Sequence, residues 1–169
     1  MRQKKIVNVL IVIAASALLL VLWFWGLNKL YAHTLVFGSN IFLSPFQDVY
    51  LEMDPEAKDP VLIVHSVIDG RTGRYPQDAK LILLPFIMIL TWQILMFFNM
   101  KIRIAVRSAL ENLLIFYLLQ VIFLIFLTQY YNSGFIKFIY NLLSDSFYIF
   151  ALFLILKDTV RYRLLKLNR

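Results

Sequence analysis

The sequence predicts an all-α membrane protein with four transmembrane helices and an extracytoplasmic β-hairpin insertion between the first two helices. The chain has 169 residues, of which 61% are hydrophobic, and its mean hydropathy is +0.74. A soluble domain has roughly 45–50% apolar residues, so the surplus indicates lipid-facing surface. The apolar residues gather in runs of about 20, the length that crosses a bilayer. Aromatic residues are also frequent (15 Phe, 9 Tyr and 3 Trp), as is common where rings lie at bilayer interfaces.

The first helix is expected over residues 6–27 and begins with the run "IVNVLIVIAASALLLVLWFW". The basic residues Arg2, Lys4 and Lys5 precede it, as they would precede the core of a signal peptide. However, the apolar run is longer than such a core, and no small-x-small cleavage pattern follows it. We therefore expect a retained transmembrane helix.

The insertion is expected over residues 33–80 as a two-stranded hairpin. "DVYLEM" alternates apolar and polar residues with a period of two, and "VLIVHSVIDG" is rich in β-branched residues and ends in an Asp-Gly turn signal. Upstream, "HTLVFGSNIFLSPF" is too apolar for a free loop, so we expect it to lie at the membrane interface. Downstream, "DGRTGRYPQD" is expected to be a connector that returns to the membrane, with Pro76 breaking any strand.

Three further helices are expected over residues 81–99, 108–130 and 138–157. Pro85 falls in the first turn or so of the second helix, where its missing N–H matters little. The fourth apolar run is the weakest of the set because polar residues interrupt it. These interruptions are Asn141, Ser144, Asp145 and Ser146.

The distribution of charge predicts that both termini are cytoplasmic. Lys and Arg gather at the N-terminus, in the turn "KIRIAVR" and in the tail "KDTVRYRLLKLNR", and such segments remain on the cytoplasmic side. The formal net charge of +7 therefore lies where cationic side chains meet anionic lipid headgroups. Hence we expect the lipid bilayer, and no nucleic acid, as a partner. The opposite side receives most of the acids: Asp48, Glu52, Asp54, Glu56, Asp59, Asp69 and Asp78.

Polar residues within the apolar runs form a candidate intramembrane site, made of Gln120, Asn141 and Asp145. Hydrogen bonding between helices is the usual role of such amides. Asp145 stands apart, because a carboxylate at the bilayer centre is expensive and is a functional candidate by default. Alternatively, the fourth helix begins later and leaves Asp145 near the surface.

No catalytic, cofactor-binding or metal site is predicted. The chain has no cysteine, and neither His33 nor His65 has further ligands at a metal-binding spacing. Arg107 and Glu111 are expected to form an i,i+4 pair near the headgroups.

The polar approach to the second helix contains Arg71, Arg74 and Asp78, and we expect it to be an extracytoplasmic docking surface. Residues 73–98, "GRYPQDAKLILLPFIMILTWQILMFF", have the layout of a junction at which some membrane enzymes carry a reactive residue. An oxygen nucleophile there needs an adjacent activating base, and none can be assigned.

The order of elements over residues 5–157 resembles that of the exosortase/archaeosortase group of membrane cysteine transpeptidases. In that family a cysteine, an arginine and a histidine lie on the successive helices after the external segment. The corresponding stretches here, "PQDAKL", "FYLLQVIFLIFLTQ" and "IYNLLSDSF", contain none of the three. The resemblance implies a cysteine-less relative, or a small exosortase-associated protein, in the bacterial inner membrane.

Two functions are compatible with these features. The first is a non-catalytic membrane subunit or assembly factor of a bacterial envelope complex for export or protein sorting, bound to a larger membrane protein. The alternative is a membrane-embedded enzyme or carrier that acts on a lipid or on a C-terminal peptide.

Overall fold

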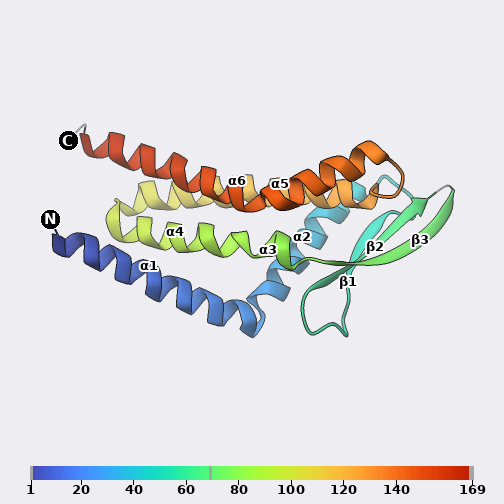
Figure 1. Ribbon diagram of the computed structural model, residues 1–169, viewed down its shortest axis with the longest axis horizontal. Coiled ribbons are helices and arrows are strands. Elements are labelled where there is room, and N and C mark those ends of the chain that lie inside the picture. Colours follow the sequence, from blue (N-terminus) through green and yellow to red (C-terminus); the bar gives the residue numbers. More distant parts are fainter. Residues whose placement is uncertain (1, 69, 168–169) are drawn as a thin grey trace. The chain divides into compact units, whose positions relative to one another are not determined.

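The computed structural model of the chain is mostly helical (72%) and contains one small antiparallel sheet (Figure 1). It describes residues 2–68 and 70–167, without the side chains of residues 2–5, 81, 145 and 162–167. The elements, in chain order, are α1 (Arg2–Leu22), a π-helical turn (Trp23–Leu27), α2 (Asn28–Leu43), β1 (Tyr50–Met53), β2 (Val61–Ile68), β3 (Arg71–Asp78), α3 (Lys80–Leu83), α4 (Pro85–Asn99), α5 (Ile102–Thr128) and α6 (Gly134–Leu167).

The four predicted spans are confirmed only in part. Among the described residues, two helices are long and apolar enough to cross a membrane, Ile6–Leu43 and Ile102–Thr128. A third candidate is the bent pair Gly134–Ser144 and Ser146–Arg161, if the pair forms one span. The predicted second span is interrupted at Leu84, and α4 has only 15 residues because Pro85 begins a new helix there.

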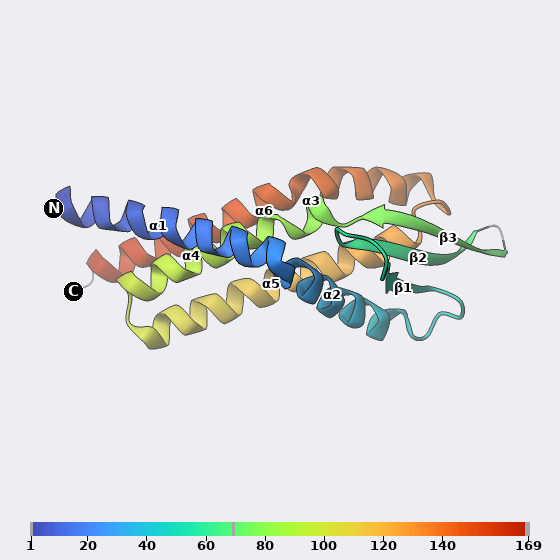
Figure 2. The same cartoon turned by 90° about the horizontal axis from the view of Figure 1, so that it is seen from below.

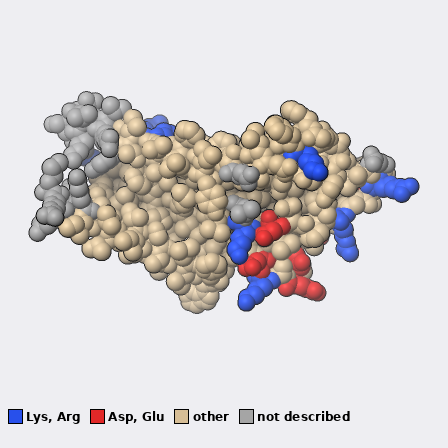
Figure 3. Space-filling view, in the orientation of Figure 1, with Lys and Arg blue, Asp and Glu red and all other residues tan. Residues whose placement is uncertain are grey.

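The helices expose large apolar side chains, as lipid-facing helices do. Leu10, Trp25 and Leu110 are 58%, 83% and 64% exposed. On the face shown in Figure 3, most of the helical surface is uncharged, and the acidic side chains gather in one area. Water disfavours an apolar surface of this extent, whereas lipid does not.

The chain divides into two compact units. The first unit contains α1, α4, the part of α5 up to Phe116 and the part of α6 from Tyr148 onward. Within it α1 and α4 lie side by side (Figure 2), and the pairs Asn8–Asn99 and Ser16–Thr91 make them antiparallel. The start of α1 and the end of α6 lie at the same end of this unit (Figures 1 and 2).

The second unit contains α2, the sheet, α3, the part of α5 from Tyr117 onward and the part of α6 up to Phe147. Its sheet has the order β1-β2-β3, so the predicted two-stranded hairpin is wrong by one strand. The third strand, β3, covers the stretch expected to be a connector, and Ile63 pairs with Pro76. Proline is tolerated in β3 because this strand lies at the edge of the sheet.

The stretch 33–43, expected as an interfacial segment, belongs instead to helix α2 and to the first candidate span. Asn40 of α2 anchors strand β1, since its side-chain oxygen accepts from the Leu51 N–H (2.8 Å) and its amide donates to the Leu51 carbonyl (2.9 Å). These two bonds satisfy backbone groups that an edge strand otherwise leaves unpaired.

Side chains of the sheet donate hydrogen bonds to backbone carbonyls at the C-terminal end of α5, where the helix has no further N–H groups for them. Ser66 donates to the Thr128 carbonyl (2.5 Å), and the Tyr75 hydroxyl donates to the Leu127 carbonyl (2.6 Å). Thr128 itself donates to the Ile125 carbonyl (2.8 Å), and the N–H of Gln129 donates to the Phe126 carbonyl (3.1 Å). The sheet is therefore fixed to α5 by directed hydrogen bonds.

Replacing Tyr75 by phenylalanine tests this attachment. The variant keeps the ring and loses one hydrogen bond, so we expect the free energy of unfolding to fall by about 1 kcal/mol at neutral pH. Burial raises the pKa of the Tyr75 hydroxyl above its ordinary value. The contribution of the hydroxyl is thus fully present below the unfolded pKa of about 10 and is lost as the pH rises through the folded pKa.

Unfolding of both proteins in detergent from pH 7 to pH 11 measures the effect. The difference between wild type and Tyr75→Phe should be constant near neutrality and shrink above about pH 10. A difference that does not change with pH would contradict a buried, protonated donor at this position.

Candidate functional site

The buried face of α6 ends in an acid. Phe147, Ala151 and Leu154 form one buried stripe at helical spacing, and Asp158 continues that stripe at the next position. Asp158 is completely buried (0% exposed). The segment predicted as a basic tail thus begins within α6, and Asp158 is buried inside the helix bundle of the first unit.

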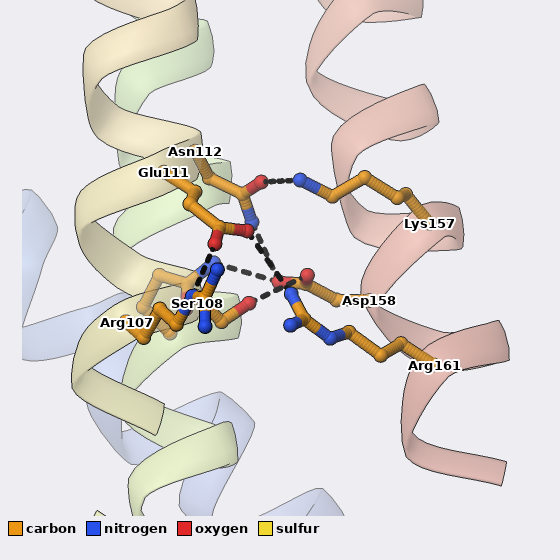
Figure 4. A network of polar contacts seen from close by, with 8 residues as sticks. Arg107, Ser108, Glu111, Asn112, Lys157, Asp158 and Arg161 are labelled. Carbon is orange, nitrogen blue, oxygen red and sulfur yellow. Dashed lines mark hydrogen bonds and ion pairs between the residues drawn. The ribbon is translucent and has the colours of Figure 1, made fainter. Parts of the chain in front are cut away.

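Three uncharged donors surround the Asp158 carboxylate (Figure 4). The Ser108 hydroxyl donates to Oδ1 (2.6 Å), and the Asn112 amide donates to Oδ2 (2.6 Å). The Gln93 amide also donates to Oδ2, at 3.0 Å. We call Gln93, Ser108, Asn112 and Asp158 the Asp158 network.

The donors lie on two other helices and occupy core positions there. Ser108 and Asn112 continue the stripe of Ala105, Ala109 and Phe116 on α5 and are 1% and 0% exposed. Gln93 lies on α4 between the buried Ile89 and Met96. Each donor lies at a buried helix position of the kind that apolar side chains usually occupy. The network joins α4, α5 and α6 through a single carboxylate.

A second layer of charges lies beside the network. Lys157 donates to the Asn112 side-chain oxygen (2.5 Å), which polarises the amide that faces Asp158. Glu111 pairs with Arg107 (2.8 Å), as the sequence predicts, and also with Arg161 across the helices (3.0 Å). Figure 4 shows these groups around the carboxylate, and among the described residues no cation pairs with Asp158 directly.

The predicted intramembrane residues do not form a common site. Gln120 is fully buried, where it accepts from the Tyr31 hydroxyl of α2 and donates to the Ile82 carbonyl of α3 (2.5 Å). Asn141 is exposed. The side chain of Asp145 is outside the described part of the structure. Gln120 thus acts as an interhelical bridge, the usual role of a buried amide.

The predicted external surface is split between the two faces of the sheet. Arg74 and Asp78 pair with His65 and Val61, which lie on the outer face, whereas Arg71 pairs with Ile68 in the alternate set. All three residues of the predicted surface are exposed.

The strand register places two further residues beside Arg74, and the sequence prediction of this surface does not include them. Tyr50, His65 and Arg74 lie directly opposite one another across β1, β2 and β3. The rings of Tyr50 and His65 stack with centroids 4.0 Å apart, and Glu52 holds the His65 Nε2 at 3.2 Å. We call Tyr50, His65 and Arg74 the outer row. A hollow of about 440 Å³ lies over it and is lined by Asp48, Tyr50, His65, Thr72, Gly73 and Arg74.

The described residues contain no group of three or more His, Cys, Asp or Glu that could hold a metal ion. The buried acid, Asp158, faces a hydroxyl and two amides instead of a second acid or a histidine. No protein-family model, curated protein or solved structure matches the chain.

Proposed function

We propose that this chain is a non-catalytic integral membrane subunit or assembly factor of a bacterial envelope complex for export or protein sorting. In this proposal the helices anchor the chain in the inner membrane, both termini are cytoplasmic, and the sheet docks on a larger membrane protein outside. The resemblance in element order to the exosortase group suggests the kind of complex.

The observation that carries the proposal is the outer row on a firmly attached sheet. Tyrosine and arginine are enriched at the centres of protein interfaces, where they supply much of the binding energy. The Tyr50 ring is already stacked on His65, so little conformational freedom is lost when a partner covers it. The bonds from Ser66 and Tyr75 to α5 hold the sheet rigid behind this row.

The polar residues inside the bundle support a structural role over a catalytic one. Asp158 is enclosed by three donors, and Gln120 is held by Tyr31 and Ile82. A catalytic group has to reach its substrate, whereas these side chains reach one another. The common end of α1 and α6 also supports a shared side for the two termini.

Affinity purification of the tagged full chain from its own membranes in mild detergent tests the proposal. We expect a stoichiometric membrane protein to copurify with the wild type. The double variant Tyr50→Ala/Arg74→Ala should reduce its recovery about tenfold or more, because truncated hot-spot residues are costly. The control Arg71→Ala removes another exposed arginine, from the alternate set of side chains, and should leave recovery unchanged.

Two results would contradict the proposal. Recovery of only a monomer or homodimer from wild-type membranes would show that the chain has no stably bound partner. Equal recovery with the double variant and with Arg71→Ala would exclude the outer row as the contact surface. Thermal unfolding of each variant separates loss of binding from loss of folding.

A further inference from the structure

Three arginines line a hollow on the surface of the first unit. The hollow is about 260 Å³ and is lined by Arg103, Ile104 and Arg107 of α5 and by Arg161 of α6. Arg103 and Arg107 are four residues apart, so they share one face of the helix. The hollow therefore gathers guanidinium groups from two successive helices, α5 and α6.

The charges around the hollow are not balanced. Glu111 pairs with Arg107 (2.8 Å) and with Arg161 (3.0 Å). Arg103 makes no ion pair with any residue that the structure describes. The neighbouring acid, Asp158, is buried and already accepts three hydrogen bonds. Three guanidinium groups facing one carboxylate leave two positive charges for an external anion.

The chemistry of the hollow favours a phosphate group. Guanidinium groups donate paired N–H bonds that match the oxygens of a phosphate. The first turn of α5 contributes the positive end of the helix dipole, since Arg103 and Ile104 follow directly on the first helical residue. The hollow, at about 260 Å³, is also large enough to admit a phosphate ester, since one water molecule occupies roughly 30 Å³ in the liquid.

The apolar surroundings point to a lipid phosphate over a free phosphate. On α5, Leu110 is 64% exposed and lies on the same helix face as Arg103 and Arg107. Ile102 of α5 and Val160 of α6 are also exposed, at 66% and 56%. Acyl chains can follow these side chains while the headgroup lies against the arginines, as occurs where basic pockets between transmembrane helices bind lipid headgroups.

We propose that Arg103, Arg107 and Arg161 form a binding site for the phosphate of an anionic membrane phospholipid. The site is independent of the proposed partner, because the outer row belongs to the other unit. No ion pair with a described residue balances the charge of Arg103, whereas Arg107 and Arg161 are both paired with Glu111.

Binding of defined lipids to the delipidated full chain in detergent, followed by native mass spectrometry, tests the site. The probes are phosphatidylglycerol, phosphatidylcholine and inorganic phosphate. We expect wild-type protein to retain phosphatidylglycerol in preference to phosphatidylcholine. Arg103→Gln should weaken that retention about tenfold, because a charge-assisted contact is lost. The control Arg71→Gln removes an exposed sheet arginine that belongs neither to the hollow nor to the outer row, and it should leave lipid retention unchanged.

Several outcomes would overturn the proposal. Equal retention of the two lipids would indicate unspecific lipid around the helices. Displacement of phosphatidylglycerol by millimolar inorganic phosphate would assign the hollow to a free anion. An unchanged affinity in Arg103→Gln, with an unchanged unfolding temperature, would exclude the arginine hollow as the binding site.

Discussion

Replacement of Asp158 by leucine is expected to lower the free energy of unfolding by about 3 kcal/mol or more. Leucine is a good helix former and fits the apolar stripe of α6. The expected loss of stability therefore does not arise from helix propensity or from an exposed apolar side chain. It comes from Ser108, Asn112 and Gln93, each of which loses its acceptor while remaining buried. A buried donor without a partner costs about 1–3 kcal/mol.

The measurement is unfolding of the purified protein in detergent by heat or by a denaturing detergent. Asp158→Asn should lie between wild type and Asp158→Leu, because one acceptor oxygen remains for Ser108. The matched control is Asp59→Leu, which makes the same chemical change at an exposed position and should be within about 0.5 kcal/mol of wild type. Wild-type stability in Asp158→Leu would show that the three donors do not depend on the carboxylate.

The burial of Asp158 is not apparent from the pattern of charges. A charged segment after an apolar run is typical of a cytoplasmic tail, and "KDTVRYRLLKLNR" therefore predicts one. The helical spacing of Phe147, Ala151, Leu154 and Asp158 contains the missing signal, since it keeps the acid on the buried face. Hydropathy averages cannot show this, because they add residues from all faces of a helix.

The helices were the easiest part of the fold to predict, and their ends the hardest. The apolar run of α5 predicts a helix, and the structure has one there that is long and apolar enough to cross a membrane. Arg107 and Glu111 pair at the predicted spacing. The interruption before α4 depends on backbone geometry around Leu84 and Pro85, which composition does not report.

The sheet shows a second limit of local patterns. The alternation in "DVYLEM" and the β-branched run in "VLIVHSVIDG" identify β1 and β2 because half-buried strands have this pattern. "RTGRYPQD" contains two arginines, an aspartate, a glycine and a proline, and it becomes strand β3 through pairing with β2 and through the Tyr75 bond to α5. Its conformation is set by tertiary contacts that cannot be recognised from its own residues.

Replacement of Gln120 by leucine should lower the free energy of unfolding by about 2 kcal/mol, since two buried groups lose their partner. The Tyr31 hydroxyl loses the acceptor that Gln120 provides, and the Ile82 carbonyl loses its side-chain donor. The Ile82 bond is the more sensitive of the two. It lies just before the break at Leu84 and Pro85, where the helix cannot supply every donor itself.

A double-mutant cycle with Tyr31→Phe separates these two contributions. In the wild-type background Tyr31→Phe should be destabilising, because it removes the donor to Gln120. In the Gln120→Leu background the same change should have a smaller effect or a stabilising one, because the hydroxyl no longer has that acceptor. Gln47→Leu, at an exposed position, is the matched control and should be neutral. Additive effects of Tyr31→Phe and Gln120→Leu would contradict the bridge, and only a coupled pair can hold α2, α3 and α5 together through one amide.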